Sequence, residues 1–85
     1  MRMTVLILGL GLIGASLAKT LKKNTAHRVL GWNRTPSVAQ RALADGAIDA
    51  TGSLEELLPQ ADITIINFYP EAIVPFILEH KDLFK

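Results

Sequence analysis

Three glycines interrupt an apolar segment near the start of the chain, and their spacing limits the possible folds more than any other feature. Residues 9–14 read GLGLIG, which is the pattern GxGxxG. Before this segment, residues 4–8 form a continuously apolar run, as in a parallel strand that is buried on both faces. After it, the apolar residues Ile13, Leu17 and Leu21 recur every four positions. We therefore predict a strand, a glycine turn and an amphipathic helix in succession.

The three glycines each have a physical role in such a turn. Gly9 permits the tight bend, Gly11 lets a phosphate approach the backbone, and Gly14 lets the helix pack closely on the strand. The N–H groups at the helix start and the helix dipole favour an anion. A Walker loop is excluded, because no GK pair followed by Ser or Thr is present. The sequence predicts that a dinucleotide binds at Gly9, Gly11, Leu12, Ile13 and Gly14, although glycines that serve packing alone remain the alternative.

The rest of the chain alternates between strand and helix patterns. We predict strands over residues 28–32, 48–51 and 63–68, and a capping box over residues 53–56 that opens a short helix. Asn24 is expected to end the first helix in a left-handed cap. Other expected helix boundaries are Thr35 and Pro36 as a start, Gly46 and Pro59 as ends, Pro70 as the last start, and Pro75 as the site of a kink or delay.

This alternation predicts an α/β fold of the Rossmann type, a doubly wound parallel sheet with right-handed crossovers. Residues 1–85 then form a single dinucleotide-binding domain of about four strands, the N-terminal part of the usual six-stranded sheet, with no substrate or dimerisation domain. An exposed sheet edge is expected in such a domain. Self-association through that edge is one hypothesis.

The end of the second predicted strand indicates the type of dinucleotide. At position 33, nineteen residues after Gly14, an NAD site usually has Asp or Glu on the ribose, whereas this chain has Asn33, Arg34 and Thr35. Arg34 can bind a 2′-phosphate, and Thr35 can add a donor. NADP is therefore favoured. NAD stays open, because Asn33 can hydrogen-bond a bare ribose and Arg34 can stack on adenine.

Aromatic residues follow the last predicted strand, at the edge where cofactors lie in this architecture. Phe68 and Tyr69 are candidate wall residues for the cofactor, with Phe68 also a candidate for the core, and Asn67 and Pro70 are expected beside them at the same edge. His27 and His80 lie far from the glycine turn in sequence and have no partner carboxylate at a diagnostic spacing. We predict no catalytic residue and no metal site in this chain.

Composition excludes several other functions. The formal net charge of +1 gives no broad field for nucleic acid or a membrane, and the apolar start is too short and too glycine-rich for a membrane helix or a signal peptide. The chain has no cysteine, so nothing indicates an oxidising compartment. A cytoplasmic protein is expected.

The start of the chain resembles the prephenate dehydrogenases, which typically open with GLGLIGGSLA where this chain reads GLGLIGASLA over residues 9–18. The resemblance continues through residues 31–34, 44–49 and 61–62. It implies NAD(P)-dependent oxidative decarboxylation of prephenate to 4-hydroxyphenylpyruvate in tyrosine biosynthesis. It also implies that the catalytic histidine and the helical substrate domain lie beyond residue 85, so that this piece is inactive alone. Residues 67–69 depart from the family pattern.

Three alternatives remain open. One is the NADP domain of a 6-phosphogluconate or 3-hydroxyacid dehydrogenase, which shares an Asn-Arg-Thr corner but usually has Met at the position of Ile13. Another is a non-enzymatic nucleotide-sensing module, which usually keeps an acidic residue at the position of Asn33. The last is a truncated fragment with no separate function.

Overall fold

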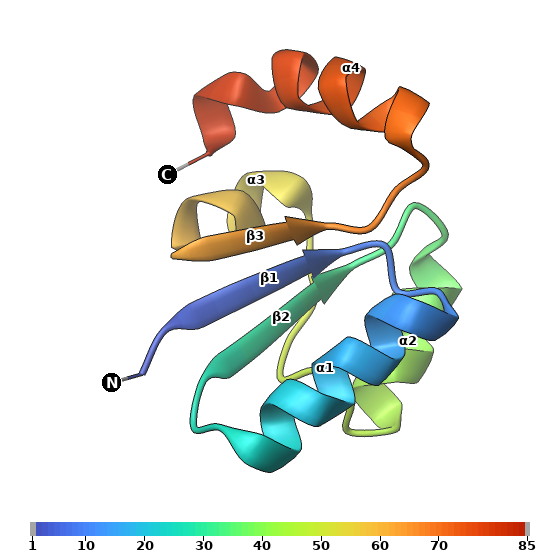
Figure 1. Ribbon diagram of the computed structural model, residues 1–85, viewed down its shortest axis with the longest axis vertical. Helices are drawn as coiled ribbons and strands as arrows, with labels where there is room; N and C mark the ends of the chain where they lie inside the picture. Colours follow the sequence, from blue (N-terminus) through green and yellow to red (C-terminus); the bar gives the residue numbers. More distant parts are fainter. Residues whose placement is uncertain (1, 85) are drawn as a thin grey trace.

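The computed structural model describes residues 2–84, which form a parallel three-stranded sheet between two layers of helices (Figure 1). The strands are β1 (Thr4–Leu8), β2 (Arg28–Trp32) and β3 (Ile63–Ile66), and their order is β2-β1-β3. Both pairings are parallel. The predicted α/β class with a parallel sheet is confirmed.

Helices cover both faces of the sheet. α1 (Leu12–Asn24) and α2 (Pro36–Ala44) lie on one side, and the short α3 (Leu54–Leu57) and α4 (Pro70–His80) lie on the other (Figure 1). Two 3-10 helices, η1 (Leu58–Gln60) and η2 (Lys81–Leu83), follow α3 and α4. Within residues 2–84, no helix combines the length and apolar character that crossing a bilayer requires.

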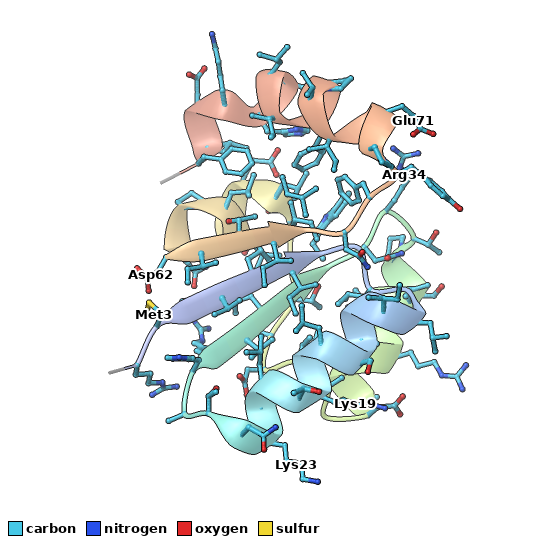
Figure 2. All side chains as sticks on the ribbon, viewed as in Figure 1. Met3, Lys19, Lys23, Arg34, Asp62 and Glu71 are labelled. Atoms are coloured by element: carbon cyan, nitrogen blue, oxygen red, sulfur yellow. The ribbon has the colours of Figure 1, made fainter. Side chains whose placement is uncertain are left out.

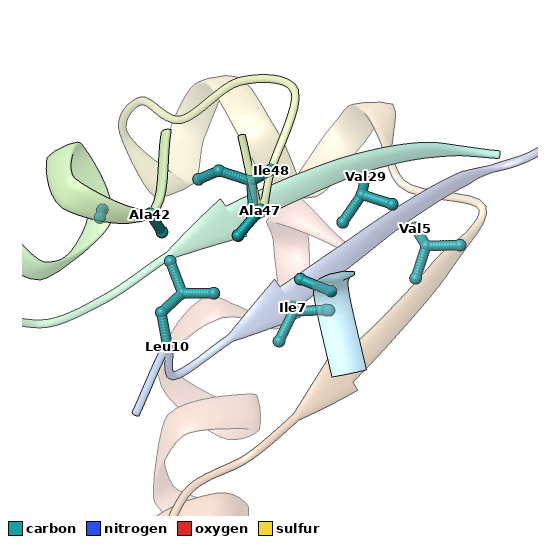
Figure 3. Close-up of a cluster of buried hydrophobic side chains, with 9 residues drawn as sticks. Val5, Ile7, Leu10, Val29, Ala42, Ala47 and Ile48 are labelled. Carbon is teal, nitrogen blue, oxygen red and sulfur yellow. The ribbon is translucent and has the colours of Figure 1, made fainter. Parts of the chain in front are cut away.

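The central strand β1 supplies the middle of the core on both faces. Val5 and Ile7 point toward α1 and α2, where they pack in one cluster with Leu10, Val29 and Ile48 (Figure 3). Leu6 and Leu8 belong to the second cluster, with residues of β2, α3 and η1. Burial on both faces explains why β1 reads as a continuous apolar run rather than an alternating one.

The prediction of a strand over residues 48–51 is wrong. The segment makes one isolated parallel bridge, between Leu30 and Ala50. Its place beside β2 is nevertheless the one that a third strand would take, because the Gly31 N–H donates to the Ala50 carbonyl at 3.1 Å. The Asp49 carboxylate accepts from the Val29 N–H at 2.8 Å. In a regular β-ladder, a backbone carbonyl of the neighbouring strand would accept this hydrogen bond.

The left-handed cap predicted at Asn24 is wrong, and of the two effects predicted at Pro75 the delay is absent. Asn24 lies within α1, and none of the described non-glycine residues has a positive φ, so it forms no left-handed cap. Instead Thr25 follows the helix in extended conformation, and its N–H and hydroxyl both donate to the Leu21 carbonyl. The start of α4 is not delayed, because the helix begins at Pro70 and continues through Pro75. The N–H that Pro75 lacks would bond to a carbonyl in the exposed first turn, where water can replace it.

Other boundaries agree with the sequence. Thr35 is the N-cap of α2 with Pro36 in its first turn, and Gly46 follows that helix with a φ of 76°. The capping box is present, since Ser53 and Glu56 exchange side-chain-to-backbone hydrogen bonds at the start of α3. The last strand is shorter than predicted and ends at Ile66.

Candidate functional site

The glycine turn connects β1 to α1 and is packed against the end of β3. Gly9 has a φ of 95°, which side chains rarely adopt, and a Cβ there would lie 2.6 Å from the Asn67 carbonyl oxygen. A Cβ on Gly14 would collide with the Gly9 carbonyl oxygen. The roles predicted for Gly9 in the bend and for Gly14 in close helix packing are confirmed.

Gly11 differs from the other two glycines because open space surrounds it. It is the N-cap of α1, and a Cβ built on it would have no neighbour within 4 Å. The first helical bond runs from the Ala15 N–H to the Gly11 carbonyl at 2.9 Å. The N–H groups of Leu12, Ile13 and Gly14 come before that bond, so the helix itself does not use them. An anion can therefore approach the backbone here.

A groove of about 640 Å³ opens at this turn, at the carboxyl ends of the three strands. Figure 2 shows Arg34 and Glu71 at this end of the molecule, and Met3 and Asp62 at the opposite end. The residues that line the groove come from the glycine turn, from the end of β2 and from the segment after β3: Gly9, Gly11, Leu12, Ile13, Asn33, Arg34, Asn67, Phe68, Tyr69, Pro70 and Ala72.

Eight of the ten residues predicted from the sequence line this groove, and the remaining two, Gly14 and Thr35, do not. Gly14 is buried beneath the turn, where it holds α1 against Gly9. Thr35 caps α2 through its backbone, and its side chain makes no capping hydrogen bond. Asn67 and Pro70, which were expected at this edge of the sheet beside Phe68 and Tyr69, also line the groove, and Ala72 is a lining residue that was not predicted.

Large apolar side chains project into solvent at the groove. Leu12 is 90% exposed, Ile13 73% and Tyr69 81%. Ile13 begins the apolar repeat of the predicted amphipathic helix but does not pack on the sheet. Gly14 and Ala18 are the buried residues of α1, and Leu17 and Leu21 of the same repeat pack on the core cluster. Exposed apolar surface beside free N–H groups is typical of a site for a ligand with a flat ring and a charged group.

Arg34 is the only charged residue among the described groove-lining residues. It directly follows Asn33, whose side chain is already hydrogen-bonded within the protein. Asn33 Oδ1 accepts from the Leu10 N–H at 2.8 Å, and Asn33 Nδ2 donates to the Thr35 carbonyl at 3.3 Å. With no carboxylate in the lining, the groove favours an anionic ligand.

Phe68 lies at the groove wall and against the core at the same time. Its ring lies 5.0 Å from that of Phe76 and 6.3 Å from that of Trp32, both in edge-on geometry. The aromatic contacts fix the floor of the groove between β2 and α4.

The two histidines lie outside the groove lining. His27 Nδ1 accepts from the Met3 N–H at 3.0 Å, beside the start of β1. His80 ends α4, and its ring packs on that of Phe76 at 4.3 Å. Both are structural residues in this arrangement.

Comparisons with known proteins agree with this geometry. The chain is 31% identical to arogenate dehydrogenase from Synechocystis, whose structure superimposes with a TM-score of 0.88 over 98% of this chain and 30% of that one. An imine reductase from Bacillus cereus gives 29% identity and a TM-score of 0.74, over 93% of this chain and 27% of that one. D-lactate dehydrogenase from Streptococcus agalactiae is 34% identical over 70 residues, which is 82% of this chain and 20% of that protein.

The chain therefore spans less than a third of the relatives that it matches. A family model covers most of it, however. Residues 1–72 match the NAD-binding domain of the D-isomer specific 2-hydroxyacid dehydrogenases. The groove at the glycine turn lies within the matched region. By this match, the chain belongs to the family of NAD-binding domains of the D-isomer specific 2-hydroxyacid dehydrogenases.

Proposed function

We propose that this dehydrogenase NAD-binding domain serves an enzyme of the prephenate and arogenate dehydrogenase type. The observation that carries the proposal is the similarity to Synechocystis arogenate dehydrogenase, with 31% identity over 98% of this chain. The GLGLIGASLA opening, which resembles that of prephenate dehydrogenases, supports it. The bound dinucleotide would accept a hydride as the substrate loses carbon dioxide, which is chemistry of the cofactor. This chain's part is to bind and orient that cofactor.

The proposed binding mode follows the groove. The pyrophosphate would lie over Gly11, where the N–H groups of Leu12 and Ile13 point out of the helix start. The adenosine would extend toward Arg34. The other half of the dinucleotide would lie along Phe68 and Tyr69, which close the groove on the β3 side.

We further propose that the site prefers NADP. Arg34 is the charged residue of the lining, and its planar guanidinium suits two oxygens of a 2′-phosphate. Position 33 is an amide, so it does not repel that phosphate as a carboxylate would.

Calorimetric titration of the 85-residue chain with NADP and with NAD tests both the site and the preference. We expect NADP to bind more tightly, and Arg34→Ala to weaken NADP by about tenfold or more while leaving NAD unchanged, as for loss of a charge-assisted pair. Lys19→Ala is the matched control, because Lys19 is an exposed cation on α1 and does not line the groove. Equal affinities in the unmodified chain would contradict the preference, and no binding to a folded chain would contradict the site.

The reaction class needs a test of its own. A chimera in which this chain replaces the matching part of Synechocystis arogenate dehydrogenase should oxidise arogenate, as measured by the absorbance of the reduced cofactor. The same replacement in the D-lactate dehydrogenase of Streptococcus agalactiae should give the weaker enzyme. The reverse ranking would favour the second candidate, a D-2-hydroxyacid dehydrogenase, which is supported by the family match over residues 1–72. A third chimera, with the imine reductase from Bacillus cereus, is a further comparison, because the structure of that enzyme is also similar to this chain.

A further inference from the structure

The side chain of Asn33 connects two backbone segments beside the groove, the glycine turn and the start of α2, that are distant in sequence. Its oxygen accepts from the Leu10 N–H in the glycine turn at 2.8 Å, and its nitrogen donates to the Thr35 carbonyl at the start of α2 at 3.3 Å. One amide therefore acts as acceptor on one side and as donor on the other. A carboxylate, which only accepts when ionised, cannot make both bonds.

Both partners of this amide fix backbone that shapes the site. The Leu10 side chain is 3% exposed, and the preceding Gly9 N–H donates to the Trp32 carbonyl at 2.7 Å. The turn is thus attached to the end of β2 at two successive residues, Gly9 and Leu10. Thr35 is the N-cap of α2, and its carbonyl also accepts from the Val38 N–H at 3.1 Å. Arg34 lies in sequence between Asn33, which binds the turn, and Thr35, which begins α2.

We propose that Asn33 is a positioning residue, whose amide holds the glycine turn and the start of α2 in register and which Asp cannot replace. Its bearing on nucleotide binding rests on the proposed function. Because Asn33 satisfies the Leu10 N–H, the free N–H groups of the helix start keep their direction toward the groove. The carboxylate in Asn33→Asp would keep the Leu10 bond but would set a negative oxygen against the Thr35 carbonyl oxygen. Asn33→Asp is the obvious change toward an NAD site, and we expect it to fail as a conversion.

Amide hydrogen exchange followed by NMR on the nucleotide-free 85-residue chain tests the positioning role directly. In Asn33→Ala, Leu10 and Val38 should both exchange about tenfold faster, since each depends on a bond that the amide makes or supports. In Asn33→Asp, Leu10 should stay protected while Val38 exchanges faster. Asn24→Ala and Asn24→Asp are matched controls at the exposed end of α1, where neither amide should change.

Titration of the same variants links the positioning role to binding. Asn33→Ala should weaken NADP and NAD by a similar factor, whereas Arg34→Ala should weaken NADP alone. Asn33→Asp should weaken NADP without any gain for NAD. The inference is overturned if Leu10 exchange in Asn33→Ala equals that of the unmodified chain, or if Asn33→Asp gains NAD affinity with Val38 still protected. If the unmodified chain binds neither nucleotide, the proposed function fails, and the exchange measurement still decides the role of Asn33.

Discussion

Asp49 and Val29 are joined by two hydrogen bonds that close the outer edge of β2. The Val29 N–H donates to Asp49 Oδ2 at 2.8 Å, and the Asp49 N–H donates to the Val29 carbonyl at 2.7 Å. The other carboxylate oxygen accepts from Lys22 Nζ at 2.8 Å, so α1 is attached to the same point. A side chain thus replaces the neighbouring strand that β2 would otherwise need at Val29.

Replacing Asp49 with Ala should lower the free energy of unfolding by about 1–3 kcal/mol, because the buried Val29 N–H loses its acceptor. Chemical denaturation measures this change. Lys22→Ala is the control: it removes only the ion pair, in which both side chains are about one-third exposed (32% and 34%). That variant should lose less than about 1 kcal/mol. Equal losses in the two variants would show that the edge bond contributes nothing measurable.

The same carboxylate predicts how stability depends on pH. The hydrogen bond from Lys22 and that from the Val29 N–H hold the pKa of Asp49 below its ordinary value of 3.8. Because this pKa is lower in the folded state than in the unfolded state, the ionised carboxylate stabilises the fold at pH values above the unfolded-state pKa. That contribution is lost as the pH falls through the folded-state pKa. Asn, which keeps an acceptor for Val29, should flatten the acid limb of the stability curve below pH 3.8. An acid limb that is unchanged in Asp49→Asn would contradict this assignment.

Gly11→Ala and Gly14→Ala should separate ligand binding from folding. At Gly14 a Cβ would collide with the Gly9 carbonyl oxygen, so Ala should destabilise the fold by about 2 kcal/mol or more. At Gly11 a Cβ meets no atom within 4 Å, so the thermal midpoint should change little. Titration with NADP should then show that Gly11→Ala binds more weakly, because the added methyl group occupies space proposed for the pyrophosphate.

The opposite pattern would contradict the assignment of the two glycines. A destabilised Gly11→Ala chain, or one that binds NADP normally, would mean that the open space at Gly11 has no part in binding. A stable Gly14→Ala chain would mean that α1 can move away from β1 at little cost.

The outer edge of β3 should support self-association of the 85-residue chain. Within residues 2–84, β3 pairs only with β1, and its apolar Ile63 is 41% exposed. Sedimentation velocity at increasing concentration should therefore show a growing dimer fraction, which Ile63→Lys should reduce. Val74→Lys places the same charge on the exposed face of α4, where Val74 is 62% exposed, and should have less effect. A chain that stays monomeric at high concentration would disprove association through this edge.

The order of elements and the glycine turn could be predicted from sequence because each depends on local patterns. An apolar run before GxGxxG is enough for β1 and the start of α1, and Ser53 with Glu56 is enough for a capping box. Most of the groove-lining residues could also be predicted, because the carboxyl ends of parallel strands meet at one edge of the sheet. Arg34 and Tyr69 reach the same groove for that reason.

The features that could not be predicted depend on contacts between distant residues. Ile13 fits the helical period, but the period does not show that Ile13 stays exposed in the first turn of α1 while Leu17 and Leu21 reach the core cluster. The bond from the Leu10 N–H to Asn33 spans 23 positions and leaves no local signal. Likewise, nothing in the residues around position 49 indicates that the Asp49 side chain would replace a strand.

The two outer edges of this sheet differ in how easily a further strand could pair with them. On the β2 side, the Asp49 carboxylate occupies a backbone donor, so an added strand would have to displace an ion pair as well as a hydrogen bond. On the β3 side, backbone groups meet no such obstacle within the described residues. We therefore expect an added strand to pair with the outer edge of β3 more readily than with that of β2.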